Sequence, residues 1–259
     1  MWDTFILNPI FNLLVSLYQL TGNLGLSIIT FTLLAKSILI PATIPALKMN
    51  KKQREIQPQL EKLKKKYKYD KQKQAELQME LFKKHGINPG AGCVTTIITF
   101  VLLIAVYRTI TTFTTSTDLS LLNDRIYFSS LKFEVEEMLK TGFLYLDLTK
   151  PDPYLIVTLL TVGLQFLASK MMLPYSKMSE KLAKKTPEQA DDMIASMQKQ
   201  NMYIMPIMFF VFGLTLPSGV MLYIMISTIF QIGQTYYFSG WGGLKPWIAK
   251  LKFVKTKEG

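Results

Sequence analysis

Long apolar stretches separated by charged segments dominate the pattern of this chain. A helix needs about 20 mostly apolar residues to cross a bilayer, and five stretches approach or reach that length. The fourth stretch is short, and Pro217 marks a tight turn between it and the fifth. We therefore predict an all-α integral membrane protein with five transmembrane helices, at residues 24–47, 93–115, 154–173, 202–216 and 217–238.

The N-terminal segment, residues 1–22, carries apolar and aromatic side chains but does not match a signal peptide. Asp3 precedes the apolar run, where a signal peptide carries Lys or Arg. Asn8, Pro9 and Asn12 disfavour a spanning helix. We therefore predict an N-terminal interfacial helix. A cleaved segment or an additional span is the alternative interpretation.

The segment 48–90 is too polar for a membrane core, but it has helical periodicity. Its apolar residues recur every three or four positions in two stripes, separated by the polar sequence KYKYD at residues 66–70. This pattern predicts a cytoplasmic antiparallel helical hairpin, and a solvated spacer is the alternative. The residues assigned to the hairpin are Ile56, Pro58, Leu60, Leu63, Tyr67, Leu77 and Leu81.

Charge is distributed unevenly, and its distribution predicts the topology. The net charge is +12, and Lys and Arg concentrate in segments 48–90 and 174–201 and in the tail 239–259, whereas segment 111–153 is acidic. Basic loops stay in the cytoplasm. We therefore expect the N-terminus outside and the C-terminus inside. Because this topology accounts for most of the basic charge, we expect no specific nucleic-acid partner.

The composition also restricts the chemistry. The single cysteine, Cys93, excludes an intrachain disulfide, and His85 is the only histidine. A lone histidine without a cluster of further ligands does not form a metal site. No glycine-rich phosphate-binding loop is present in the sequence. We expect no metal, no cofactor and no enzymatic activity.

Lys36 lies alone near the centre of the first predicted span. A cation at mid-bilayer costs about 2.5–3.5 kcal/mol on insertion scales, and no Asp or Glu occurs in any predicted span to pair with it. The absence of an intramembrane carboxylate also disfavours an ion-coupled transporter. Polar residues concentrate at mid-depth and toward the cytoplasmic ends, which indicates a wet concavity that opens inward. Alternatively, these residues link helices by hydrogen bonds. The predicted groove residues are Lys36, Thr32, Thr43, Thr99, Gln165, Ser169, Ser227, Gln231 and Gln234.

Four motifs stand in order along nearly the whole chain: the hairpin with KKHGINPGAGC (83–93), AVYRTI (105–110), GFLYLDLTKPDPYLI (142–156) and MYIMPIMFFVFGLTLPSGVMLY (202–223). Together they resemble the YidC family of membrane protein insertases, in the Oxa-type superfamily. The family's groove carries an arginine where this chain has Lys36, which lacks the planar fork for bidentate carboxylate contact. Ile224 stands at the family's usual tryptophan, and Ala168 and Ser169 replace a usual glutamine pair.

The resemblance implies a five-helix bundle around a hydrophilic groove that is open to the cytosol and to lipid. The implied function is insertion: nascent or newly made proteins enter the groove, and their helices leave laterally into the bilayer without nucleotide hydrolysis. The implied location is a bacterial plasma (inner) membrane. Expected partners are nascent membrane proteins and the phospholipid bilayer, with the ribosome and the Sec translocation channel as further candidates. A transporter or channel subunit, and a membrane scaffold or chaperone for complex assembly, remain the alternatives.

Overall fold

The computed structural model describes residues 3–67, 69–87, 91–115, 123–133, 140–172 and 193–250. Most of the predicted loop 174–201, up to residue 192, and the tail beyond residue 250 lie outside the described residues. The chain divides into two compact units. Unit 1 consists of residues 1–40, 96–165 and 205–230, and unit 2 consists of residues 41–95, 166–204 and 231–259.

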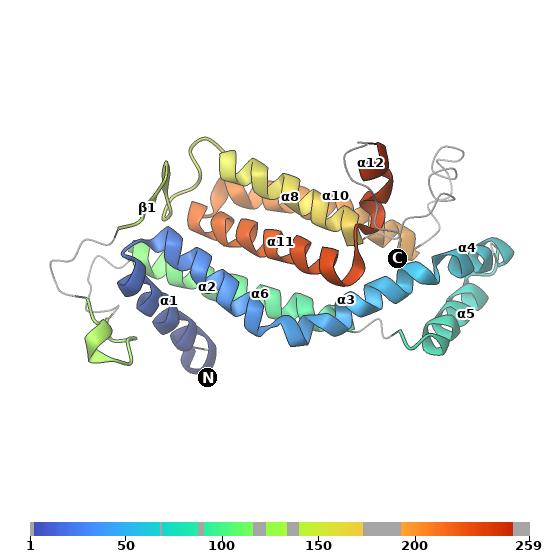
Figure 1. Cartoon of the computed structure of the whole chain (residues 1–259), viewed down its shortest axis with the longest axis horizontal. Helices are drawn as coiled ribbons and strands as arrows, with labels where there is room; N and C mark the ends of the chain where they lie inside the picture. Colours follow the sequence, from blue (N-terminus) through green and yellow to red (C-terminus); the bar gives the residue numbers. More distant parts are fainter. Residues whose placement is uncertain are drawn as a thin grey trace. The chain divides into compact units, whose positions relative to one another are not determined.

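The described part of the chain is almost entirely helical (Figure 1). The one β-structure among the described residues is a two-stranded antiparallel hairpin, β1 and β2, in which Gly142 pairs with Asp147. The elements are a π-helical turn η1 (Asp3–Leu7), α1 (Asn8–Thr21), α2 (Leu24–Ile38), α3 (Ile40–Glu55), α4 (Gln57–Lys66), α5 (Lys71–Lys84), α6 (Ala91–Thr115), η2 (Ser129–Leu131), β1 (Gly142–Phe143), β2 (Leu146–Asp147), α8 (Ile156–Met172), α10 (Met193–Thr215), α11 (Ser218–Ser239), η3 (Gly242–Leu244) and α12 (Lys245–Lys250).

The first helices begin and end where local chemistry dictates. Gly22 follows α1 in the left-handed conformation, φ 64°, and its N–H donates to the carbonyl of Tyr18. Asn23 then caps α2, because its side-chain oxygen accepts from the backbone N–H groups of Gly25 at 2.9 Å and Leu26 at 3.2 Å. A left-handed glycine followed by an N-cap asparagine therefore separates α1 from α2.

The predicted span 24–47 is divided in the structure, because α2 ends at Ile38 and α3 begins at Ile40. Proline has no N–H, and its ring clashes with the carbonyl four residues earlier. Pro41 therefore cannot continue the helical hydrogen bonding back to Ser37, although it is well tolerated in the first turn of α3. The second half of the predicted span instead begins a helix that continues to Glu55, into the segment assigned to the hairpin.

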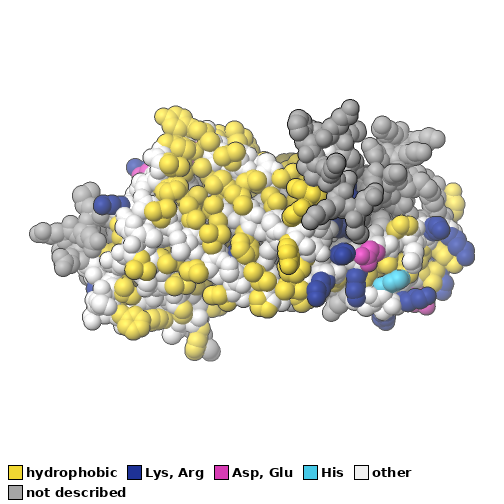
Figure 2. Space-filling view, in the orientation of Figure 1, with side chains coloured by type: hydrophobic (Ala, Val, Ile, Leu, Met, Phe, Trp, Pro, Cys, Tyr) yellow, Lys and Arg dark blue, Asp and Glu magenta, His cyan; other side chains and the backbone are white. Residues whose placement is uncertain are grey.

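Unit 1 has a single apolar core, to which α1, α2, α6 and α11 all contribute. On α1 the burial is one-sided: Leu14 and Val15 are inaccessible, whereas Leu20 is 82% exposed. The outer surfaces of the remaining helices also carry large apolar side chains (Figure 2). Exposed examples are Leu33 and Leu34 on α2, Ile104 on α6, Leu159 and Leu160 on α8, and Val211 and Leu214 on α10. Such a surface is suited to lipid rather than to water.

Unit 2 contains a small separate core, formed where α4 and α5 lie side by side (Figure 1). Ile56 and Leu60 pack with Phe82 and Ile87, and Met49 and Leu81 cover the edge of this cluster. Asp70 caps the N-terminus of α5, because its carboxylate accepts a hydrogen bond from the N–H of Lys73 at 2.9 Å. The outer surface of α4 and α5 is rich in Lys, as Figure 2 shows.

By length and composition, one described helical stretch, Asp3–Thr21, is long and apolar enough to cross a membrane by itself. Helices α2 and α3 meet the same criterion only when they are taken together as one broken span. Three further described stretches are apolar but shorter, at Ile97–Thr112, Ile156–Met172 and Tyr203–Thr215.

Candidate functional site

Lys36 lies in the last turn of α2, directly before the break at Leu39. It is half-buried, and the described residues provide neither an ion pair nor a hydrogen bond to its ammonium. A cation is favoured near the C-terminal carbonyls of a helix, because the helix dipole is negative there. The break therefore gives Lys36 a better electrostatic position than the middle of a continuous span, although the charge still lacks a counter-ion among the described residues.

Two of the predicted groove residues in unit 1 lie in its packed interior. The buried Thr32 hydroxyl donates to the carbonyl of Ile28 at 2.6 Å within α2. Ser227 on α11 is also buried, and neither its hydroxyl nor that of Tyr223, one turn earlier, has a hydrogen-bond partner within the described parts. Thr99 on α6, by contrast, is exposed.

Gln165 connects two helices of unit 1. Its side-chain oxygen accepts a hydrogen bond from the hydroxyl of Thr228 at 3.1 Å, which joins α8 to α11. Thr228 was not predicted, because attention to the face formed by residues 227, 231 and 234 left out the adjacent position. The signal available in the sequence was a threonine directly after the predicted position Ser227, within an apolar stretch. The structure adds that Thr228 is buried.

The remaining predicted groove residues lie in unit 2, and three of them, Thr43, Gln231 and Gln234, make contacts between elements. The Gln234 amide donates to the Thr43 hydroxyl at 3.4 Å, which links α11 to α3. The Gln231 amide lies 3.8 Å from the sulfur of Met172 on α8. Ser169 is half-buried. All three predicted glutamines thus bridge elements, as expected for polar side chains that hold apolar helices together.

The structure distributes the predicted hairpin residues over the small core of unit 2 and its edge. Ile56 and Leu60 are buried, with 3% and 4% of their surface exposed, and Pro58 is exposed at the start of α4. Leu63, Tyr67, Leu77 and Leu81 are half-buried. The residues that sequence reasoning missed are Phe82 and Ile87, which complete the core from the end of α5.

Arg54, also not predicted, lies at a junction within unit 2. Its Nη1 donates to the carbonyl of Ser239 at 3.2 Å, and the Ser239 hydroxyl donates to the carbonyl of Leu47 at 3.0 Å. Burial lowers the pKa of Arg54 from its ordinary value, because low-dielectric surroundings disfavour the charged form. These contacts fix the C-terminal end of α11 against α3, where a cation also complements the helix dipole.

A second cation of unit 2 has an aromatic partner. The ammonium of Lys170, near the end of α8, lies 2.9 Å from the ring centre of Trp247 on α12. Phe166, one turn earlier on α8, also contacts Trp247, with ring centres 6.5 Å apart. This cation–π contact stabilises the ammonium of Lys170 near the end of an apolar helix.

A search of the described residues finds no group of three or more His, Cys, Asp or Glu side chains able to hold a metal ion. The polar groups of the candidate site are instead a cation, hydroxyls and amides. Such groups donate and accept hydrogen bonds, and the cation attracts negative charge.

Comparisons with known proteins identify the family of this chain. The family model "60Kd inner membrane protein" matches residues 16–241. The membrane protein insertase MisCA of Bacillus subtilis is 31% identical over 244 residues, which cover 92% of this chain and 79% of that protein. The membrane protein insertase YidC of Fusobacterium nucleatum is 30% identical over 216 residues, which cover 83% of this chain and 86% of that protein.

A solved structure shows the same fold. The crystal structure of an active YidC insertase with its first transmembrane domain resolved superimposes with a TM-score of 0.58, at 24% sequence identity. The match covers 91% of this chain and 46% of that one, so this chain spans about half of the solved protein.

A mostly helical structure with large exposed apolar side chains is typical of an α-helical membrane protein. The extent of the family match and of the two sequence matches shows more: the chain belongs to the YidC family of membrane protein insertases, which are inner membrane proteins.

Proposed function

We propose that this insertase holds the hydrophilic outer segment of a nascent membrane protein in a water-filled groove that faces the cytosol. In unit 1 its polar residues are Lys36, Thr99 and Gln165. From the sequence pattern alone we also assign Thr43, Ser169, Gln231 and Gln234 to it. The groove shortens the hydrocarbon distance that the segment must cross. The apolar helix of the client then partitions laterally into lipid, driven by its own hydrophobic transfer and without nucleotide hydrolysis.

One observation carries this proposal, namely the half-buried ammonium of Lys36 without a counter-ion among the described residues. A charge in this position costs free energy unless water or an anion reaches it. The chain retains it in a helix whose other side chains are mostly apolar. An acidic client segment would supply the missing counter-charge during insertion, which explains why a permanent internal partner is not needed.

The proposal includes an orientation and further partners. Five spans place the N-terminus outside and the basic C-terminal tail inside, with residues 1–22 at the outer interface. The hairpin α4–α5 then lies in the cytoplasm, where its basic surface meets anionic lipid, clients and the ribosome. The Sec translocation channel is a further candidate partner on the same membrane.

Site-specific photo-crosslinking to a stalled nascent client tests the groove. A crosslinker at position 36 or at Gln165 is expected to capture the acidic outer segment of the client. Leu160, 55% exposed on the same helix as Gln165, is the matched control that faces elsewhere and should capture little. Equal capture at all three positions would show contact without a groove and would contradict the proposal. Ion flux through the purified protein would favour a channel instead.

A further inference from the structure

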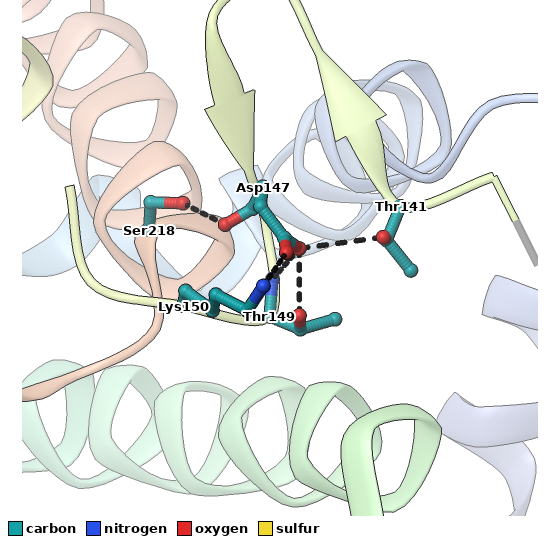
Figure 3. Close-up of polar contacts among 5 residues, drawn as sticks. All are labelled: Thr141, Asp147, Thr149, Lys150 and Ser218. Atoms are coloured by element: carbon teal, nitrogen blue, oxygen red, sulfur yellow. Dashed lines mark hydrogen bonds and ion pairs between the residues drawn. The ribbon is translucent and has the colours of Figure 1, made fainter. Parts of the chain in front are cut away.

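A carboxylate in the loop between α6 and α8 is held by an unusually complete set of donors (Figure 3). The Asp147 side chain accepts from the Thr149 hydroxyl at 2.6 Å, the Thr149 N–H at 3.2 Å and the Thr141 hydroxyl at 3.3 Å. The ammonium of Lys150 lies 3.0 Å away. Burial alone would raise the pKa of Asp147, but the hydrogen bonds from Thr149 and Lys150 prevail, so its pKa lies below the ordinary value. The charged carboxylate thus joins Thr141, Thr149 and Lys150 within the loop.

The same loop holds the beginning of α11. The Ser218 hydroxyl donates to the backbone carbonyl of Asp147 at 2.8 Å, and the Ser218 N–H donates to the carbonyl of Lys150 at 2.7 Å. The Gly219 N–H donates to the carbonyl of Leu148 at 3.0 Å. The first N–H groups of a helix have no partner within the helix. The loop provides those partners, and a side chain at Gly219 would crowd the Leu148 carbonyl.

The loop also holds the beginning of α2. The Leu24 N–H donates to the carbonyl of Lys140 at 3.3 Å, and the Asn23 amide donates to the carbonyl of Gly142 at 2.9 Å. The Phe143 ring occupies the position that a side chain at Gly25 would take. The glycine thus lets β1 approach the helix closely.

A third attachment fixes α8 through Asp152, a buried carboxylate. One of its oxygens accepts from the N–H groups of Val157 at 2.8 Å and Thr158 at 3.2 Å, in the first turn of the helix. Between the attachments, Leu146 and Leu148 are buried in the core of unit 1. Polar bonds therefore hold the helix ends together, and apolar side chains fill the space beneath.

We propose that residues 140–158, hereafter the outer latch, join these ends of α2, α8 and α11 into an ion-tight seal, with Asp147 as its positioning residue. The latch lies on the outer side of the membrane in the proposed orientation, so the seal rests on the proposed function. A groove filled with water from the cytosol must end before the outer surface if the membrane is to keep its ion gradients. The latch provides that end, and its hydrogen bonds allow the helices to part only at their inner ends.

The test compares Asp147→Ala and Asp147→Asn with Asp124→Asn, which removes the same charge from an exposed site in the same predicted outer segment. Hydrogen exchange reports on the latch directly through the N–H groups of Ser218 and Gly219. Loss of the charged hydrogen bonds should raise their exchange about tenfold or more. Proteoliposomes with the Ala variant should leak protons about tenfold faster than wild type, the Asn variant should leak less, and Asp124→Asn should match wild type.

Exchange that rises without any leak would overturn the seal, and unchanged exchange would overturn the latch. If Asp147→Ala fails to fold, Thr149→Val removes the 2.6 Å bond while keeping side-chain size, with the same two outcomes. Client insertion is measured in the same vesicles. If the wild-type protein does not take the client into the groove while Asp147→Ala still leaks, the proposed function is disproved and the seal is not.

Discussion

Lys36 combines a feature visible in the sequence with one that only the structure supplies. The sequence shows a lone cation in an apolar stretch without any acidic partner in a predicted span. The structure adds that the helix breaks three residues later, so the charge lies in the last turn of a helix rather than at the centre of a continuous span. The helix end thus reduces the free-energy cost of the Lys36 charge. In the proposed function, a carboxylate of the client segment stabilises that charge further.

Substitutions at Lys36 should therefore separate charge from shape. Lys36→Glu repels acidic segments and is expected to lower the insertion of clients with acidic outer segments about tenfold or more, since a contact with a charged group contributes about 1.5–3 kcal/mol. Lys36→Ala should have a smaller effect in the same direction, and Lys36→Arg should retain function. Protease protection of the client's outer segment in vesicles measures insertion.

The control for Lys36 is Lys48→Glu, which reverses an exposed charge on α3. The insertion of clients without acidic outer segments should be unchanged by either substitution. Normal insertion of acidic clients by Lys36→Glu would exclude the electrostatic role.

Among the elements, the paired helices α4 and α5 depend on a core of only a few side chains. Ile56, Leu60, Phe82 and Ile87 are its buried members, and the turn that connects the helices contributes none of them. A core of so few side chains provides little stability by itself, because a small unit buries a smaller fraction of its surface than a large one. The hairpin is thus suited to gain order from lipid or from a client.

Deletion of the turn, residues 68–70, should consequently lower insertion less than deletion of the whole pair, residues 57–84. The short deletion removes Asp70, the N-cap of α5, but leaves the four core residues in place. Insertion is measured at equal amounts of protein in the membrane. If both deletions abolish insertion completely, the hairpin does not tolerate local rearrangement. That result would contradict its proposed role in capturing clients.

The sequence predicted the helical elements much better than their interruptions and contacts. Apolar length predicted α6, α8 and α11 to within about two residues of their ends, because these helices are bounded by polar or proline-containing segments. The break at Leu39 was missed although Pro41 was visible, since hydropathy alone does not register a lost backbone hydrogen bond. The contacts Gln165–Thr228 and Arg54–Ser239 join residues far apart in the chain, which helical periodicity cannot indicate.

The outer latch illustrates the same limit for short irregular segments. The sequence showed the motif at residues 142–156 as a family resemblance, but it did not predict the contacts that this motif makes with the helix ends. Its effect depends on which backbone groups Ser218, Asn23 and Asp152 reach, and these are properties of the folded chain.

At the scale of the whole molecule, basic and acidic residues are concentrated in different segments of the chain. The basic segments are the hairpin and the C-terminal tail, whereas the outer latch and its flanking residues form the acidic part. Positive segments remain on the cytoplasmic side during membrane insertion. The hairpin and the latch are therefore expected on opposite sides of the membrane, and each offers a well-exposed position for labelling.

Cysteine labelling tests this topology in a Cys93→Ser background, which leaves no other thiol in the chain. Leu144, 88% exposed in the latch hairpin, and Tyr69, 93% exposed in the turn between α4 and α5, are each replaced by Cys. A membrane-impermeant maleimide added to intact spheroplasts should modify Leu144→Cys and should reach Tyr69→Cys only after lysis. The opposite order would invert the topology, place Lys36 in a cavity open to the outside, and remove the basis for both the cytosolic groove and the outer seal. Labelling of both positions in intact cells would instead indicate leaky spheroplasts, which a cytoplasmic marker protein detects.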